Sequence, residues 1–518
     1  MSIAILSFIK SYSKPSSSKY YLTDNKGFRE ATANEVCSVQ DYLVTHDYWM
    51  ICQDIYEEAG CLPPKVIDLD EFHILTSPDG DERKRREKVD AIQRINRLFP
   101  LNFNISQRYK GNFYGETEPD LEAIEAFHEI LLIYYIELCR VAHQNGEFHR
   151  FFEIEVPCQN ICSTMSSRGI KIHASRIADF RLNARHDYYT CLRELSDKFD
   201  VPLEIPSRED IISYATSKGV DTDEYGFEFV LNFMPQVRDF CETIQRLREL
   251  DRTRGVLDSL AVRGGRVHPV LDTQGSRTSR ISARSPYLQS LAKRYRSILV
   301  ADPGYELGYV DFDQFEVGIM AALSGDAELH RLFSQADMYE SFRIDCLKGE
   351  GDRKAAKIMF LAYAYGMKLN NLPIIGAKFG ISRNVVRSAF KKFGRYEEWK
   401  QETLRNFDKT GFVATSLGNR FFMKGPKATK KERLSAISQV VQGEGSLIFK
   451  KALIEVYGLK DIELLLPMHD ALLFQSPVST TLNAVIDIFV RVIGDHFDNA
   501  IEGKASAELF AEANGPIE

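Results

Sequence analysis

The stretch YELGYVDFDQFEVGIMAALSGD, residues 305–326, decides the fold of this 518-residue chain. Its first part has the apolar pattern of a strand that ends at Asp311, and the apolar spacing of a helix begins at Phe315. The carboxylate of Asp311 is therefore expected at a strand-to-helix corner. A hard divalent cation such as Mg²⁺ takes oxygen ligands and is commonly held by one or two carboxylates together with substrate phosphates. Such a site needs a second carboxylate from elsewhere in the chain.

The second carboxylate is expected from IELLLPMHDALLF, residues 462–474. Only His469 and Asp470 separate its two apolar runs, which predicts a tight hairpin above a buried sheet. Polar groups inside apolar runs are costly to bury, which favours a functional role for Asp470. The alternative is a partnered His-Asp pair in the core.

A helix is predicted between these stretches, in DRKAAKIMFLAYAYGM, residues 352–367. It should begin near Asp352 and end at Gly366. Four residues at intervals of four form one stripe on it: Arg353, Lys357, Leu361 and Tyr365. A nucleoside triphosphate would fit along this stripe, with its phosphates on the cations and its base near the aromatic ring. The alternative is a solvated basic turn followed by a core stripe.

Together, and in this order, the three stretches resemble the polymerase motifs of family A DNA polymerases, the group of bacterial polymerase I and many bacteriophage replicative enzymes. The resemblance implies that Asp311 and Asp470 are catalytic ligands of two Mg²⁺ ions, with Mn²⁺ as a substitute. It places Glu316 and Gln314 at the incoming nucleotide, where Glu316 screens the sugar. His469 would neighbour the primer terminus.

The same resemblance assigns the helical stripe to the incoming nucleotide. Arg353 and Lys357 would bind the triphosphate, and Tyr365 would lie beside the templating base. Leu361 stands where an aromatic residue is usual, so altered discrimination between sugar analogues is expected.

Three further stretches resemble DNA-contacting segments of the family. HPVLDTQGSRTSRISARSPYLQSL, residues 268–291, would bring Arg280 and Gln289 to duplex DNA near the primer end, although a long exposed loop is the alternative. Arg420 would face the template. Gln442 would read the minor groove, whose acceptors are nearly alike for every correct base pair.

Three other positions depart from the family pattern. Ala471 replaces the usual Glu after His-Asp, Asp313 replaces a small residue, and Tyr339 stands where His is frequent. The two metals would therefore depend on Asp311 and Asp470.

The expected fold is mixed α/β, a right-hand polymerase over residues 148–518 with a smaller N-terminal α/β domain over residues 1–147. The hand would comprise a thumb (about 174–262), a palm (about 263–335 and 430–518) and fingers (about 336–429). The N-terminal domain takes the place of the family's 3′–5′ exonuclease, yet residues 2–9 contain no acid and the expected Tyr-x-x-x-Asp is absent. We expect a degenerate exonuclease-like domain without nuclease activity, kept as a scaffold or a partner surface.

Composition narrows the class of protein. A net charge of −7 and a pI near 6.0 argue against a wholly basic nucleic-acid-binding protein, but residues 292–296 and 420–433 form local basic patches. The charged run at residues 81–88 is expected to be exposed. Nine cysteines without CxxC pairs and no membrane-length apolar run predict a cytoplasmic protein. The resemblance to the family implies the cytoplasm of a bacterium or of a phage-infected host.

The predicted function is template-directed addition of deoxynucleotides to a primer 3′ hydroxyl, without proofreading. Primer-template DNA and dNTPs are the expected partners, with a processivity factor, helicase or primase beside them and no membrane. Two alternatives stay open: an enzyme like the single-subunit RNA polymerases, and a non-catalytic DNA-binding protein on a lapsed polymerase scaffold. Glu316, Gln442 and Arg280 favour DNA synthesis.

Overall fold

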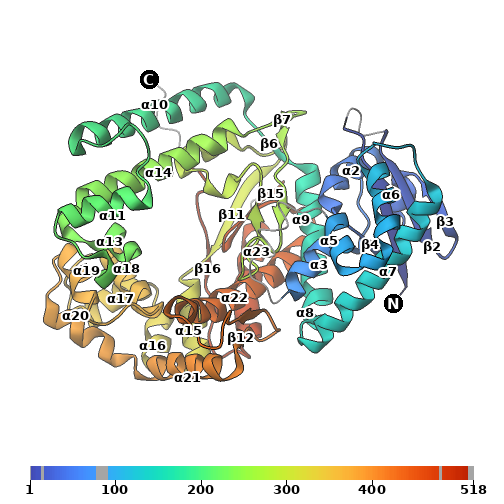
Figure 1. The fold of residues 1–518 in the computed structure, drawn as a ribbon. Coiled ribbons are helices and arrows are strands. Elements are labelled where there is room, and N and C mark those ends of the chain that lie inside the picture. The colour runs from blue at the N-terminus through green and yellow to red at the C-terminus, as the bar shows by residue number, and fades with distance from the viewer. Residues whose placement is uncertain (1, 13–16, 78–90, 478–480, 512–518) are drawn as a thin grey trace.

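The computed structural model describes residues 2–12, 17–77, 91–477 and 481–511 (Figure 1). The charged run predicted at residues 81–88 lies outside these ranges. Two sheets organise the chain, one near each end of the sequence, and helices connect and surround them. Among the described helices, none combines the length and the apolar character needed to cross a bilayer.

The N-terminal part is built on a five-stranded sheet of order β3-β2-β1-β4-β5. Strand β1 pairs antiparallel with β2 and parallel with β4, and β4 pairs parallel with β5. The strands are β1 (Ile3–Ile9), β2 (Lys19–Asp24), β3 (Gly27–Ala31), β4 (Tyr42–Thr45) and β5 (Val66–Asp68). The helices are α1 (Ala33–Cys37), α2 (Cys52–Ala59), α3 (Leu69–Thr76), α5 (Ala91–Leu98), α6 (Phe103–Phe113) and α7 (Leu121–Gln144).

Strand β1 is central and buried, as its nearly unbroken apolar sequence predicts. Its one polar side chain, Ser7, is fully buried and lies 2.7 Å from Nε2 of His128 on α7. The other ring nitrogen of His128 lies 2.6 Å from Oγ1 of Thr23 on β2. A hydrogen-bonded Ser-His-Thr chain therefore fixes α7 to the sheet, where the predicted exonuclease resemblance would require carboxylates.

The second sheet has the order β14-β15-β11-β16. Its strands are β11 (Glu306–Phe312), β14 (Glu463–Met468), β15 (Ala471–Ser476) and β16 (Ala505–Ala507). Strands β14 and β15 form the predicted hairpin with His469 and Asp470 at its turn. Three helices pack beside this sheet: α15 (Phe315–Ser324), α22 (Lys430–Tyr457) and α23 (Thr481–His496). The ring of Phe312 on β11 stacks on that of Phe315 of α15, with 4.2 Å between centroids, and its centroid lies 4.4 Å from that of Phe489 of α23. These aromatic contacts hold the strand-to-helix corner in place.

Two helical regions flank this sheet: α10 and α14 cross the top of Figure 1, α16 and α21 lie along its bottom, and the two regions meet at the left, where α13 contacts α19. The first region contains α10 (Ala174–Phe199), α11 (Arg208–Ser217), α12 (Thr222–Tyr225), α13 (Phe227–Phe233) and α14 (Arg238–Asp258). The second contains α16 (Ala327–Ser334), α17 (Met338–Asp345), α18 (Arg353–Ala364), α19 (Leu372–Lys378), α20 (Arg383–Ala389), α21 (Gly394–Thr410) and the hairpin of β12 (Phe412–Ala414) and β13 (Arg420–Phe422).

Short elements complete the chain. The N-terminal part is joined to the rest of the chain by α8 (Phe148–Arg150), the π-helical turn η4 (Phe151–Glu155) and α9 (Val156–Arg168). Small strands follow as β6 (Ile170–Lys171), β7 (Val262–Arg263), β8 (Arg266–Val267), β9 (Leu271–Asp272) and β10 (Ser282–Ala283). The predicted helix over residues 352–366 is confirmed as α18, because Asp352 caps its first turn by accepting a hydrogen bond from the Ala355 N–H.

Candidate active site

Asp311 and Asp470 lie at the same end of the second sheet, β14-β15-β11-β16, which we call the central sheet. Asp311 on β11 pairs with Ala471, the first residue of β15, and Asp470 directly precedes Ala471. Burial raises the pKa of Asp311 to about 7, and the nearby carboxylates of Glu508, Asp470 and Asp313 add to that rise. Burial also raises the pKa of Asp470. The two carboxyl groups are thus close to other acids and partly buried, and both conditions disfavour their ionised forms.

This donor set suits a hard divalent cation. Carboxylate oxygens are the ligands that Mg²⁺ and Mn²⁺ prefer, and a bound cation would relieve the repulsion between Asp311 and Asp470. Across the described ranges, no three His, Cys, Asp or Glu side chains converge as a complete metal site. Two protein carboxylates leave coordination positions for substrate phosphates and water, which is the usual arrangement for Mg²⁺.

Arg280 connects the two acidic motifs. Its Nη2 atom donates to Oδ2 of Asp470 at 3.2 Å and to Oε1 of Glu316 at 3.1 Å. The Nε2 atom of Gln442 donates to the same Glu316 oxygen at 3.3 Å. Tyr365 is packed beside Glu316, and burial followed by the Glu316 charge raises the pKa of its hydroxyl. Five residues predicted from separate motifs therefore meet here.

The predicted stripe on α18 ends at this cluster. Its two cations are exposed, and both lie 5.7 Å from the ring centroid of Tyr339: Arg353 and Lys357. Arg353 also pairs with Asp337, while 54% of its side chain stays exposed. Leu361 is partly buried against the core. The stripe thus presents two accessible cations at one end and Tyr365 at the other, next to Glu316.

Gln289 lies near the site but is turned away from solvent. Its side chain is 4% exposed. The amide accepts from the Ala283 N–H at 3.0 Å and donates to the carbonyls of Ile281 at 3.1 Å and Pro467 at 2.8 Å. Its polar groups are thus used within the protein, where they join the strand after Arg280 to the Asp470 hairpin, and its direct contact with DNA stays a prediction.

Gln314 has a similar supporting position. Its Oε1 atom accepts from the Met338 N–H at 2.7 Å, and its Nε2 atom donates to the Ala336 carbonyl at 3.2 Å. The side chain therefore holds the start of α17 against the strand-to-helix corner. Its predicted contact with the nucleotide would require these hydrogen bonds to open.

Three residues with a left-handed backbone adjoin the cluster. They are Ser279 (φ 60°), Gln314 (φ 55°) and His469 (φ 60°). Such conformations are uncommon for residues with a Cβ, and they persist where the surrounding structure holds them. Two of them immediately precede the functional side chains of Arg280 and Asp470, and His469 itself is exposed at the hairpin turn.

Arg420 lies apart from the cluster, on the β12–β13 hairpin. Its guanidinium stacks over the Phe412 ring at 4.6 Å, and its Nη1 atom lies 3.5 Å from Oδ1 of Asn145 at the end of α7. The hairpin that was predicted to face the template is thus in contact with the N-terminal part.

The sequence prediction missed Glu508, which follows β16. Strand β16 pairs with β11, and the Glu508 N–H donates to the Tyr309 carbonyl at 3.0 Å, which brings the Glu508 charge close to Asp311. The neighbouring Ser506 hydroxyl donates to Asp313 at 2.8 Å. The pairing of β16 with β11 could not be read from the local sequence pattern.

The family assignment rests on the sequence of the region that contains this cluster. A model of DNA polymerase family A matches residues 194–501, more than half of the chain. The chain belongs to DNA polymerase family A. Asp311, Glu316, Arg353, Gln442 and Asp470 all fall within the matched residues, so the predicted family is confirmed.

Bacterial DNA polymerase I proteins are similar to this family A chain. The thermostable DNA polymerase I of Thermus thermophilus is 24% identical over 410 residues, which cover 72% of this chain and 48% of the relative. The DNA polymerase I of Mycobacterium tuberculosis is 25% identical over 377 residues, 62% of this chain and 40% of the relative. The chain thus spans about half the length of the curated relatives it matches.

The fold of this family A member also resembles a solved polymerase structure. The POL domain of Pol1 from M. smegmatis, in complex with DNA primer-template and dNTP, superposes with a TM-score of 0.72 at 17% identity. The match covers 97% of this chain and 94% of that chain. The predicted mixed α/β polymerase fold is therefore confirmed.

Proposed function

We propose that the chain is a DNA-directed DNA polymerase that adds deoxynucleotides to a primer 3′ hydroxyl. The observation that carries this proposal is the cluster in which Arg280 joins Asp470 to Glu316 beside Gln442 and Tyr365. These residues come from separate stretches, and each was predicted to act on the primer-template duplex, the nucleotide or the metal. The names of the similar proteins, and the primer-template DNA and dNTP in the Pol1 complex, support the same function.

The arrangement of the helical regions supports a right-hand assignment. We assign residues 174–262 to a thumb, 263–335 and 430–518 to a palm, and 336–429 to fingers. The helical regions at the top and at the bottom of Figure 1 would then face duplex DNA and the incoming nucleotide.

The acidic corner would act on the reacting atoms. Asp311 and Asp470 would hold two Mg²⁺ ions, or Mn²⁺ in their place, at the end of the sheet. When bound, such ions lower the pKa of the primer 3′ hydroxyl and stabilise charge on the triphosphate. The two carboxylates are held in fixed positions because Asp311 lies on β11 and Asp470 lies at the turn directly before its partner strand β15.

The helical stripe would bind the nucleotide. Arg353 and Lys357 are accessible cations on one face of α18, so both can donate to phosphate oxygens and stabilise charge on the leaving pyrophosphate. Arg353 would then break its ion pair with Asp337 and bind a phosphate oxygen of the nucleotide. Glu316, held by Arg280 and Gln442, would occupy the space of a ribose 2′ hydroxyl.

Arg280 would have different partners with and without DNA. In the structure it balances part of the charge of Asp470 and Glu316. Once cations and a primer are present, its guanidinium would be free to contact the minor groove at the primer end. Gln442 would then test base-pair geometry there, since correct pairs present nearly the same acceptors.

The N-terminal domain would not proofread. The two acids at the end of β5 have structural roles, because Asp68 accepts from the N–H groups of Tyr48 and Asp70, and Asp70 pairs with buried Arg94. We also propose a cytoplasmic location in a bacterium or a phage-infected host, supported by nine cysteines that are all free thiols. A processivity factor, helicase or primase would be a further partner.

Primer extension tests this proposal. A 5′-labelled primer on a template, with Mg²⁺ and dNTPs, should be extended by the wild-type protein and left unchanged by Asp470→Asn. Asp461→Asn removes an exposed carboxylate near the other end of β14 and should extend normally. Extension with ribonucleotides alone would favour the RNA polymerase alternative. Tight primer-template binding without any extension would favour the non-catalytic alternative.

A further inference from the structure

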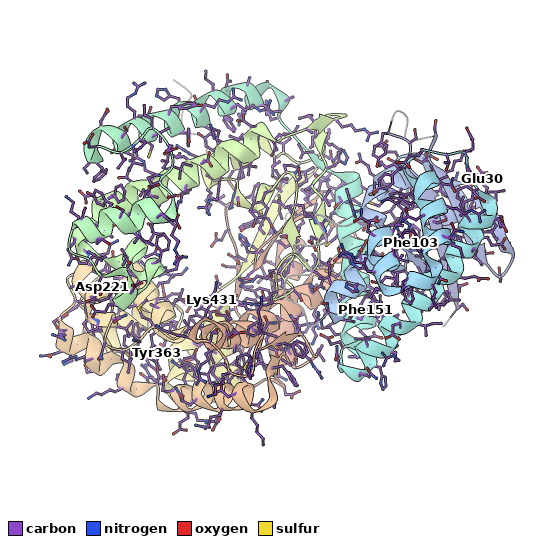
Figure 2. All side chains as sticks on the ribbon, viewed as in Figure 1. Glu30, Phe103, Phe151, Asp221, Tyr363 and Lys431 are labelled. Atoms are coloured by element: carbon purple, nitrogen blue, oxygen red, sulfur yellow. The ribbon has the colours of Figure 1, made fainter. Side chains whose placement is uncertain are left out.

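The joint between the N-terminal domain and the polymerase region consists of residues 145–155. It runs from the C-cap of α7 through α8 into the π-helical turn η4. Isolated π-helical turns are rare and are frequently found at functional sites. Figure 2 labels Phe151 at this boundary, where its ring stacks on Phe72 of α3 at 3.5 Å and fastens the joint to the N-terminal domain.

Three charged residues of the joint are buried: Glu147 is 2% exposed, Arg150 is 1% exposed and Glu155 is 3% exposed. Arg150 Nη1 donates to Glu147 Oε1 at 3.4 Å, and Arg150 Nε donates to Glu155 Oε1 at 3.0 Å. Glu155 Oε2 accepts from Lys450 Nζ at 2.6 Å and from Gln274 Nε2 at 2.8 Å. Burial alone would raise the pKa of Glu155, but Lys450 and Arg150 outweigh it and lower the pKa. Glu155 is therefore charged and paired.

This cluster holds the Arg280 loop, which we define as residues 273–280. Lys450 Nζ donates to the Thr273 carbonyl at 2.9 Å at one end of the loop. At the other end, the Ser279 hydroxyl accepts from Arg150 Nη2 at 3.3 Å and from Asn419 Nδ2 at 3.1 Å. Ser279 is buried, its φ is 60°, and it directly precedes Arg280. The direction in which Arg280 leaves the backbone is thus set by contacts of Ser279.

The joint also holds the hairpin that carries Arg420. Gly418 approaches the joint so closely that a Cβ on it would lie 2.8 Å from the Gly146 carbonyl oxygen. Asn145 contacts the Arg420 guanidinium, and Asn419 connects the same hairpin to Ser279. One short segment therefore contacts both loops that bear proposed DNA-binding arginines.

We propose that Arg150 and Glu155 are positioning residues of the polymerase site, which act through Ser279 to hold Arg280 against Asp470 and Glu316. The N-terminal domain would then serve as the support from which the primer-contacting loop is aligned. This inference rests on the proposed polymerase function. Buried ion pairs can instead serve packing alone, so the test must separate alignment of Arg280 from general stability.

Ser279→Gly is the most informative variant. Glycine adopts a φ of about 60° without strain, so the fold should be kept while the hydroxyl that joins Arg150 and Asn419 is lost. We expect kcat for primer extension to fall about tenfold, because displacement of a catalytic group by about 1 Å can cost that much or more. KM for dNTP should change less than about twofold, and Tm should stay within about 2 °C of wild type.

A double-mutant cycle shows whether the effect passes through Arg280. If Ser279 acts by positioning Arg280, Ser279→Gly should change kcat less than about twofold in an Arg280→Ala background. Losses that multiply independently, or wild-type kcat in the Ser279→Gly single variant, would overturn the proposal. Arg150→Lys keeps the positive charge but loses the planar guanidinium, which bonds Glu155 and Ser279 through different nitrogens. It should therefore also lower kcat about tenfold, with a small change in Tm. Asp461→Gly is the matched control, because it also places glycine at a residue with a left-handed backbone, here with φ 64° on an exposed loop. It should leave kcat unchanged.

Hydrogen exchange gives a readout that does not depend on activity. Amides of residues 276–281 should exchange about tenfold faster in Ser279→Gly than in wild type, while α7 and β11 keep their protection. If the wild-type protein extends no primer, the proposed function fails, and faster exchange would still support alignment of the loop. Unchanged exchange in a protein that does extend primers would overturn the inference alone.

Discussion

The guanidinium of Arg280 lies 3.2 Å from the carboxylate of Asp470, although 190 residues separate them in the sequence. The contact joins a polar loop to the turn of the β14–β15 hairpin, and the same nitrogen reaches Glu316. A cation that serves two carboxylates at once fixes their relative positions. Arg280 is therefore the residue that connects the Arg280 loop to both Asp470 and Glu316.

Replacing Arg280 should impair primer extension strongly. We expect Arg280→Ala to lower kcat/KM for extension about 100-fold, because it removes the proposed primer contact and leaves the charges of Asp470 and Glu316 less well balanced. Arg280→Lys should recover only part of this loss, since an ammonium cannot reproduce the planar fork. Steady-state extension assays measure both variants. Arg395→Ala, which removes an exposed arginine paired on α21, is the control and should keep wild-type kcat/KM.

Leu361 should influence which sugars the enzyme accepts. It lies on the stripe of α18 between Lys357 and Tyr365, and it stands where the family usually has an aromatic residue. We expect Leu361→Phe to change incorporation of dideoxynucleotides relative to deoxynucleotides by about tenfold, as a ring packs differently against the sugar. Competition between the two nucleotide types in a termination ladder measures this ratio. An unchanged ratio would show that this position does not contact the sugar.

Acid should destabilise the N-terminal domain through His128. Burial, and then the neighbouring His46, lowers the pKa of His128 to about 3 from an ordinary value near 6.5. Between these values the unfolded chain binds a proton that the folded domain does not, so stability falls as pH falls below about 6.5 and the loss is complete near pH 3. His128 alone should account for about 2 kcal/mol between pH 7 and pH 5.

Urea unfolding at pH 7 and pH 5 tests the His128 prediction. His128→Gln can still hydrogen-bond with Ser7 and Thr23 but does not titrate, so its free energy of unfolding should depend less on pH by about 2 kcal/mol. Equal pH dependence in wild type and variant would mean that His128 does not remain neutral in the folded domain.

The N-terminal domain should leave a 3′ end intact. Asp68 caps α3 and Asp70 pairs with Arg94, so neither acid is arranged as an open metal site. We expect a 3′-labelled primer to stay at full length during incubation with Mg²⁺ and no nucleotides. Shortening that disappears in Asp68→Ala or Asp70→Ala would establish a nuclease in this domain. Circular dichroism of both variants would check that they remain folded.

Local patterns predicted the elements of the site well. The strand to Asp311, the helix α18 capped by Asp352 and the hairpin at Asp470 were all readable, because each depends on apolar periodicity and end signals within about 20 residues. Glu316 and Gln442 were identified by resemblance to the family, and the structure brings them within hydrogen-bonding distance.

Contacts between distant segments could not be predicted in the same way. The pairing of β16 with β11 brings Glu508 toward Asp311, and sequence patterns do not specify which strands pair. Gln289 was assigned to duplex DNA by resemblance to the family, and the sequence did not show that its amide would bond with three backbone groups. No sequence pattern indicated that the joint, residues 145–155, contains a buried ion-pair cluster. Arg and Glu are usually exposed, so the burial of Arg150 and Glu155 became evident only with their partners in the structure.

Templated incorporation of single nucleotides tests the central claim most directly. Four templates that differ in the first unpaired base, each supplied with one dNTP at a time and Mg²⁺, should show extension by one nucleotide only for the complementary pair. Asp470→Asn should abolish this extension, and Asp461→Asn should preserve it. Extension that ignores the template base, or that persists in Asp470→Asn, would contradict the assignment of a template-directed polymerase site to Asp311 and Asp470.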